Sequence, residues 1–202
     1  DLWLGPAKEK PFTPNMHPFS WRGWWDYGTG ALGDVGCHLI DIPFRTLGLK
    51  YPTSAECSVG SVFSKMWSPD YIPEGCPPSS FITINFDATK KSQKPIKMTW
   101  SDGGIRPSHP DIIPANNDIG GKDSANGVLI IGEKGIISTN INDSSPLMPK
   151  LYLFDGTTDF GPETEKIIEP EYGHQRKWVD ACKAGFNSKK HLALTSSFDY
   201  AG

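Results

Sequence analysis

The sequence lacks the features of membrane and nucleic-acid-binding proteins. It contains no apolar run of about 18 residues, the length that a membrane-spanning helix needs. Its first residues lack the basic stretch and apolar core of a secretory signal peptide. Basic residues are not in excess, since 20 Lys and Arg stand against 23 Asp and Glu for a net charge of −3. We therefore expect a soluble protein, cytoplasmic or periplasmic, that binds neither membranes nor nucleic acid.

An initiator Met is also absent, because the chain begins at Asp1. We expect the chain to come from inside a longer gene product or to follow processing. Its 202 residues suffice for one domain that buries roughly 70% of its unfolded surface. We predict a single domain over residues 1–202.

The four cysteines lack the spacing of a metal or redox site. Cys37, Cys57, Cys76 and Cys182 contain no C-x-x-C pair and no zinc-ribbon pattern. Scattered buried thiols are the simplest interpretation. One disulfide in an oxidising compartment remains an alternative.

Turn-forming and aromatic residues, by contrast, are abundant. The chain has 21 Gly, 18 Pro and 7 Trp, a composition typical of a β-rich protein with long loops. Residues 1–27 combine prolines that block regular helix with many aromatic side chains, so this entry segment is predicted to be extended. A segment this aromatic must lie on the core or on a ligand.

Hydrophobic periodicity predicts two helices around a run of strands. Leu32, Val35 and Leu39 fall near helical spacing. Gly48 is a plausible C-cap, and Pro43 predicts a kink. Periodicity and turn chemistry predict helices over 31–47 and 171–185, strands over 54–63, 80–87, 96–100, 128–131, 136–140 and 151–154, and the start of another element at 195–202.

The order of these elements predicts the fold class. A helix, a run of antiparallel strands and another helix are typical of an α+β domain, here an open, mostly antiparallel β-sheet with helices packed on one face and no Rossmann domain. The apolar alternation of the strands suggests that a second subunit covers the other face, so we expect a homo-oligomer. The polar loop over 102–124 has a length that is usually functional or mobile. The second helix is predicted to turn Trp178, Ala181, Cys182 and Phe186 inward.

A row of polar residues follows one side of the first predicted helix. Asp34, His38, Asp41 and Arg45 recur at steps of four, three and four residues. A His titrates near neutrality, so it can take the proton of a hydroxyl group. Asp34, one turn earlier, can orient that imidazole and would be favoured by the helix dipole in the first turn. Two other interpretations stay open: a solvated helix face with interface ion pairs, and a zinc or manganese site on the two Asp and the His.

The stretch that carries this row resembles a known family. Residues 24–41 read Trp-Trp-Asp-Tyr-Gly-Thr-Gly-Ala-Leu-Gly-Asp-Val-Gly-Cys-His-Leu-Ile-Asp, which resembles the glucose–fructose oxidoreductase, inositol dehydrogenase and MocA (Gfo/Idh/MocA) family. The family motif Asp-x-Gly-x-His-x-x-Asp matches Asp34, Gly36, His38 and Asp41 position by position. The aromatic run just before it and the closing residues 198–202 resemble a branch common in Bacteroides-type bacteria.

The resemblance implies an activity that is shared between two domains. Such a C-terminal domain supplies catalytic groups to an oxidoreductase acting on a sugar, polyol or glycoside. His38 would be the general acid/base, and Asp34 would bind and orient the reacting hydroxyl. NAD or NADP would be bound by an N-terminal Rossmann domain that this chain does not contain, since G-x-G-x-x-G between a strand and a helix is absent. The chain alone is therefore expected to be inactive.

One motif is treated as coincidence. The family's catalytic Lys comes from a Glu-Lys-Pro motif in the nucleotide domain, and residues 9–11 also spell Glu-Lys-Pro. They follow no strand pattern and lie close before the helix motif. A catalytic Lys needs a positioned and perturbed environment, so Lys10 is not predicted to be catalytic.

Further residues are candidates for contact with the substrate. Aromatic faces suit the apolar side of a sugar ring, and Arg grips hydroxyls or carboxylates. The predicted substrate-binding residues are Arg22, Trp24, Trp25, Asp41 and Arg106. Core packing of the tryptophans and a plain surface loop around Arg106 are the alternatives.

Three rival functions stay open. A non-enzymatic carbohydrate-binding module would bind sugar independently of His38. A metal-dependent lyase or hydrolase would use Asp34, His38 and Asp41, although we assign no metal site. Some members of the family also use tightly held NAD for non-redox glycoside cleavage.

Overall fold

The computed structural model describes residues 2–14, 16, 19–117, 119, 126–141, 149–157 and 172–201. The chain forms two compact units, Asp1–Thr158 and Asp159–Gly202. The helices are η1 (Leu2–Leu4), η2 (Ser20–Gly23), α1 (Gly30–Leu39), α2 (Asp41–Leu47), α3 (Gly173–Ala184), α4 (Lys189–Leu192) and α5 (Phe198–Ala201). The strands are β1 (Ser54–Val59), β2 (Ser80–Phe86), β3 (Ile96–Ser101), β4 (Asn126–Ile131), β5 (Gly135–Ile141) and β6 (Lys150–Leu153).

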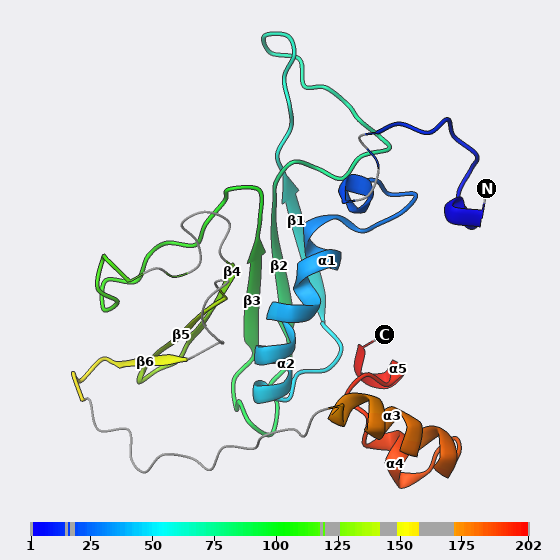
Figure 1. The fold of residues 1–202 in the computed structure, drawn as a ribbon. Coiled ribbons are helices and arrows are strands. Elements are labelled where there is room, and N and C mark those ends of the chain that lie inside the picture. Colours follow the sequence, from blue (N-terminus) through cyan, green and yellow to red (C-terminus); the bar gives the residue numbers. More distant parts are fainter. Residues whose placement is uncertain are drawn as a thin grey trace. The chain divides into compact units, whose positions relative to one another are not determined.

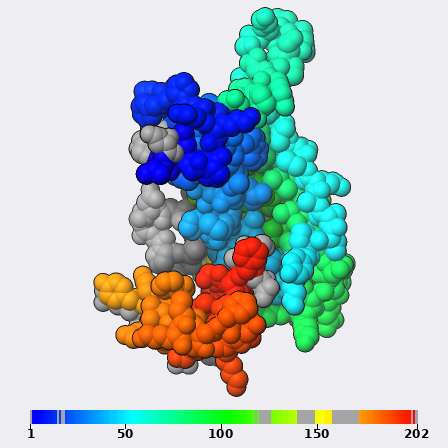
Figure 2. All heavy atoms as spheres, turned by 90° about the vertical axis from the view of Figure 1, so that its right-hand side faces the viewer, coloured from blue at the N-terminus to red at the C-terminus, as the bar shows by residue number. Residues whose placement is uncertain are grey.

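The first sheet is antiparallel, in the order β1-β2-β3, and helices α1 and α2 lie against one of its faces (Figures 1 and 2). Cross-strand partners share a face, and Ile82 opposes Trp100 while Phe86 opposes Ile96. Phe86 and Trp100 are buried, as is Leu39 on α1. The alternating apolar side chains of β2 and β3 therefore lie on the face that the helices cover.

The opposite face of this sheet is mostly polar. The register places Glu56 on β1, Thr83 on β2 and Thr99 on β3 side by side on this face, and Lys97 on β3 opposes Asn85 there. Phe81 is the apolar exception and is 38% exposed. The apolar residues that suggested a second subunit on this face thus lie on the helix-covered face instead. A homo-oligomer that forms through the open face of the sheet stays a prediction.

The second sheet belongs to the same unit and is also antiparallel, in the order β4-β5-β6. The predicted hairpin is confirmed, with the Gly132 N–H bonded to the Gly135 carbonyl across its turn. The loop after β3 supplies Ile113, only 2% exposed, and Asn117, whose Nδ2 donates to the Tyr152 hydroxyl at 2.9 Å. The described part of this loop is therefore anchored rather than free.

The first helix differs from the prediction. A single helix over 31–47 with a kink at Pro43 was expected, but α1 ends at Leu39 and α2 begins at Asp41. Pro43 has no N–H to donate to the Leu39 carbonyl, so the interruption falls one turn before the proline. Gly48 caps α2 with φ +65°, which confirms the predicted C-cap.

The α+β class is confirmed, with two differences in detail. The strands form two sheets of three rather than one open sheet. The strand predicted over 54–63 ends at Val59. Every strand pair in the described residues is antiparallel, so no Rossmann fold is present in them.

The second unit is described over residues 172–201 and contains α3, α4 and α5. The predicted second helix is confirmed as α3, and Ala181 is buried as expected. The inward placement of the other three residues is wrong: Trp178 is 63% and Phe186 is 84% exposed, and Cys182 is exposed. The Phe186 ring packs against the His191 ring on α4, with 4.9 Å between the ring centres, and the rest of it faces solvent.

The thiols also differ from the prediction. All four are free, and Cys37, Cys57 and Cys182 are exposed, while Cys76 is half-buried. Cys57 lies on the edge strand β1, and Cys37 lies on the exposed side of α1, so neither reaches the core. No helix in the described segments is long and apolar enough to cross a membrane.

Candidate functional site

The site is built on a glycine turn that precedes α1. A Cβ on Gly28 would lie 2.6 Å from the main-chain Cα and O of Arg22, and Gly30 has φ +67°. Glycine is needed at the first position for close approach and at the second for its left-handed backbone. The Gly28 and Tyr27 N–H groups both donate to the Trp24 carbonyl, at 2.8 and 2.9 Å. The turn thereby folds η2 back against the start of α1.

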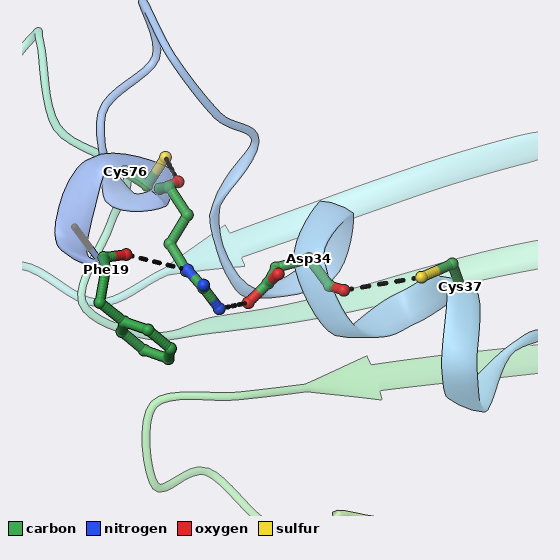
Figure 3. A network of polar contacts seen from close by, with 5 residues as sticks. Phe19, Asp34, Cys37 and Cys76 are labelled. Carbon is green, nitrogen blue, oxygen red and sulfur yellow. Dashed lines mark hydrogen bonds and ion pairs between the residues drawn. The ribbon is translucent and has the colours of Figure 1, made fainter. Parts of the chain in front are cut away.

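This fold-back joins two predicted site residues. Arg22 Nη1 forms an ion pair and hydrogen bond with Asp34 Oδ2 (Figure 3). Arg22 Nε donates to the Phe19 carbonyl at 3.0 Å, and the guanidinium lies 3.7 Å from the centre of the Phe19 ring. Arg22 and Asp34 are each about one-third exposed at their side chains. The carboxylate thus has a fixed cationic partner at the edge of solvent.

The rest of the polar row lies on the exposed side of α1 and α2. His38 and Asp41 are exposed, whereas Leu39 and Pro43 are buried. His38 stands one turn after Asp34 on the same helix face. Asp34 is the fifth residue of α1 and lies outside its first turn, so the predicted helix-dipole contribution is wrong. Its charge is met by Arg22 instead.

The tryptophans before the turn have different environments. Trp24 is half-buried and bridges to Gly75, while the Trp25 N–H donates to the Glu74 carbonyl at 3.0 Å. The side chain of Trp25 remains exposed, at 54% for the residue. Trp25 is therefore not a core residue, and more than half of its surface is accessible to a ligand or partner.

The loop after β3 divides into a structural and an exposed part. Asp102 Oδ1 accepts from the Ser80 N–H at 2.7 Å, and Asp102 Oδ2 accepts from Ser80 Oγ at 2.6 Å and Trp100 Nε1 at 2.7 Å. Asp102 thus ties β2 to β3. Arg106 lies farther along and is exposed, and its participation in a site with α1 stays a prediction.

Lys10 has the electrostatics of a structural ion pair. Its Nζ lies 2.6 Å from Asp26 Oδ2 and 3.6 Å from Glu74 Oε2. The hydrogen bond to Asp26 raises the pKa of Lys10 above its ordinary value, and the charges of Asp26 and Glu74 act in the same direction. A raised pKa keeps the amine protonated at neutral pH, which is the opposite of what a Lys base requires.

The metal alternative finds no support in the described residues. No group of three or more His, Cys, Asp or Glu side chains in them is arranged to hold a metal ion. Asp34 is paired with Arg22, and His38 follows it by a full turn.

Phe19 is a member of the site that the sequence did not identify. Its carbonyl and its ring both hold Arg22, and both contacts depend on the backbone of η2. The spacing of three residues between Phe19 and Arg22 is the one sequence feature that could have indicated this contact. No local pattern in the sequence indicates that Arg22 and Asp34 lie in contact.

Residues 1–57 match the model of the oxidoreductase family, C-terminal alpha/beta domain, of the Gfo/Idh/MocA proteins. The matched segment contains every predicted site residue except Arg106. A search of curated proteins found no match to the chain. The match spans less than a third of the chain and distinguishes no branch of the family. It supports the Gfo/Idh/MocA C-terminal domain family for residues 1–57, and with it an oxidoreductase context for this part of the chain.

Proposed function

We propose that this chain is the substrate-binding and acid/base part of an NAD(P)-dependent oxidoreductase that acts on a hydroxyl of a sugar, polyol or glycoside. The observation that carries the proposal is the Arg22–Asp34 ion pair, which lies one helical turn before the exposed His38. The same three residues lie inside the segment that matches the oxidoreductase family.

Each residue has a role that its position supports. Oxidation of a hydroxyl releases a proton and a hydride, and the exposed imidazole of His38 takes the proton. Asp34 accepts a hydrogen bond from the same hydroxyl through the carboxylate oxygen that Arg22 leaves open. Arg22 positions Asp34, because its guanidinium is itself held by Phe19. The ring of Trp25, together with Asp41 and Arg106, contacts the remainder of the substrate.

The nucleotide does not fit the described residues. The Gly28–Gly30 turn follows the 3-10 helix η2 rather than a strand, and main-chain atoms of Arg22 occupy the space beside Gly28. Phosphate binding at a dinucleotide fold needs a strand, a glycine turn and a helix in a βαβ unit. We therefore assign NAD or NADP to a separate Rossmann domain of the same protein and derive no step through it.

The test is a turnover assay on the full-length gene product with NAD+ and NADP+ against sugars, polyols and glycosides. Reduction of nicotinamide by one substrate class is the expected result, and the preferred nucleotide follows from the same data. Sugar binding without turnover by wild type would contradict the proposal and favour a binding module. Turnover that needs an added divalent metal and no nucleotide would favour the lyase or hydrolase. Glycoside cleavage without net nicotinamide reduction would favour the non-redox reaction.

Arg22→Ala is expected to lower kcat/KM about tenfold, because Asp34 loses the group that positions it. Arg22→Lys should restore part of the loss through its charge, but not all, because Lys lacks the planar guanidinium that stacks on Phe19. Steady-state kinetics of both variants provide the measurement. Equal activity of Arg22→Ala and wild type would show that the ion pair is a surface contact only.

A further inference from the structure

The connection between β1 and β2 is an exposed apolar arm, which we define as residues 60–76. In Figures 1 and 2 this teal segment extends beyond the ends of β1 and β2, away from α2. Its large side chains are uncovered. The exposed fractions are 48% for Val62, 57% for Phe63, 81% for Met66, 88% for Trp67, 87% for Tyr71 and 58% for Ile72.

The arm has a defined backbone that holds these side chains outward. Ser64 Oγ donates to Asp70 Oδ1 at 2.6 Å, and the Asp70 N–H donates to the Val62 carbonyl at 2.7 Å. Lys65 and Ser68 form an antiparallel bridge at the tip. The polar groups thus close the arm on itself, while the apolar groups face solvent, which is the reverse of ordinary packing.

The tip contains a strained residue. Trp67 has φ +65°, a left-handed conformation that is an outlier for a bulky side chain. Such strain is typically found at functional positions. Here it presents an indole at the far end of the arm, where nothing in the described chain covers it.

The root of the arm joins it to a second exposed aromatic segment. The Cys76 N–H donates to the Gly23 carbonyl at 2.8 Å, and Glu74 accepts from the Trp25 N–H. Phe19, 68% exposed, and Trp25 lie on that neighbouring segment. The root of the arm therefore lies beside a segment that carries two further exposed aromatic residues.

We propose that the arm docks on a second copy of this chain, so that two arms are buried in one reciprocal interface. Large side chains cover about 150–250 Å² each, so the exposed fractions of the six arm residues leave roughly 900 Å² to be buried. A stable interface needs about 800 Å² from each partner. Two-fold reciprocal contacts are the commonest form of self-association, and they would cover both arms at once.

The charge of the arm favours a protein partner over a lipid surface. Residues 60–76 contain one Lys against one Asp and one Glu. A membrane-binding loop gains affinity from several basic residues, which this arm lacks. Low charge beside Trp, Tyr and Met is typical of the buried centre of a protein interface.

The test is sedimentation equilibrium of the full-length protein with Trp67→Gly. Glycine relieves the positive φ, so the arm should keep its backbone while it loses the indole. We expect dimeric wild type and a dimer Kd at least about tenfold higher in the variant, with unchanged far-ultraviolet circular dichroism. Met66→Ser should act in the same direction. Tyr51→Ser, which removes an exposed ring outside the arm, should leave the Kd unchanged and is the matched control.

Two results would overturn the proposal. One is a monomeric wild type throughout the micromolar range. The other is a dimer that both arm variants leave intact but that Thr83→Lys, on the open face of β2, disrupts, since that would place the contact on the sheet. Neither result depends on catalytic activity, so the proposed function is tested separately.

Discussion

His38→Ala is expected to lower kcat/KM for the preferred hydroxyl substrate at least about a hundredfold in the full-length enzyme. We assign the imidazole of His38, on the exposed side of α1, as the group that takes the proton of the reacting hydroxyl. Because His38 is exposed on a helix, replacement by Ala should change the free energy of unfolding by no more than about 0.5 kcal/mol. Loss of activity without loss of stability is the expected combination, measured by nicotinamide reduction and thermal unfolding.

The control for this variant is His174→Ala, which removes an exposed His from α3 and should leave turnover unchanged. Free imidazole should restore part of the activity of His38→Ala, because an exposed position is accessible to a small base. If His38→Ala keeps activity within a few-fold of wild type, the proton is handled by another group. The polar row on α1 would then be a solvated helix face.

Asp102→Ala is expected to lower the free energy of unfolding by about 3 kcal/mol. The carboxylate accepts three hydrogen bonds, from the Ser80 N–H, the Ser80 hydroxyl and the Trp100 indole. Both partner residues are buried, at 6% and 9% exposed, so their donors would lose their acceptor away from bulk water. Urea unfolding followed by fluorescence provides the measurement.

Asp87→Ala is the matched control, because Asp87 directly follows β2 and is exposed. It should change stability by less than about 0.5 kcal/mol. The loss of stability in Asp102→Asn should fall between those of Asp102→Ala and Asp87→Ala, since an amide keeps one acceptor oxygen but replaces the other with a donor. If Asp102→Ala matches Asp87→Ala, then the three hydrogen bonds contribute little and the backbone pairing of β2 with β3 suffices to join the strands.

Local patterns in the sequence predicted the elements of regular structure well. Alternating apolar residues identified β2 and β3, and turn chemistry identified the hairpin of β4 and β5. Helical periodicity identified α1, α2 and α3. These patterns succeed because one buried face is set by neighbours a few residues away. The helix is interrupted at Ile40 rather than at Pro43, because the hydrogen bond that Pro43 cannot form would have ended one turn earlier, at the Leu39 carbonyl.

Of the candidate site, only the residues on helix α1 could be predicted from the sequence. Spacing placed Asp34 and His38 on one face, and the structure places them there. The helix-dipole argument failed because it depended on where α1 begins, and helix ends are the least certain part of a prediction. The family resemblance added roles for these residues, which the expected kinetics of His38→Ala will test.

Sequence by itself determined the α+β class, the strand pairs joined by short turns and the polar row on α1, because each depends on local periodicity. Only the tertiary structure decided the contact of Arg22 with Asp34, the use of Asp102 to join two strands and the exposure of the arm at residues 60–76. These features depend on residues distant in the chain, or on whether any partner covers an apolar side chain. An isolated window of sequence carries no information about either, since burial is a property of the packed chain.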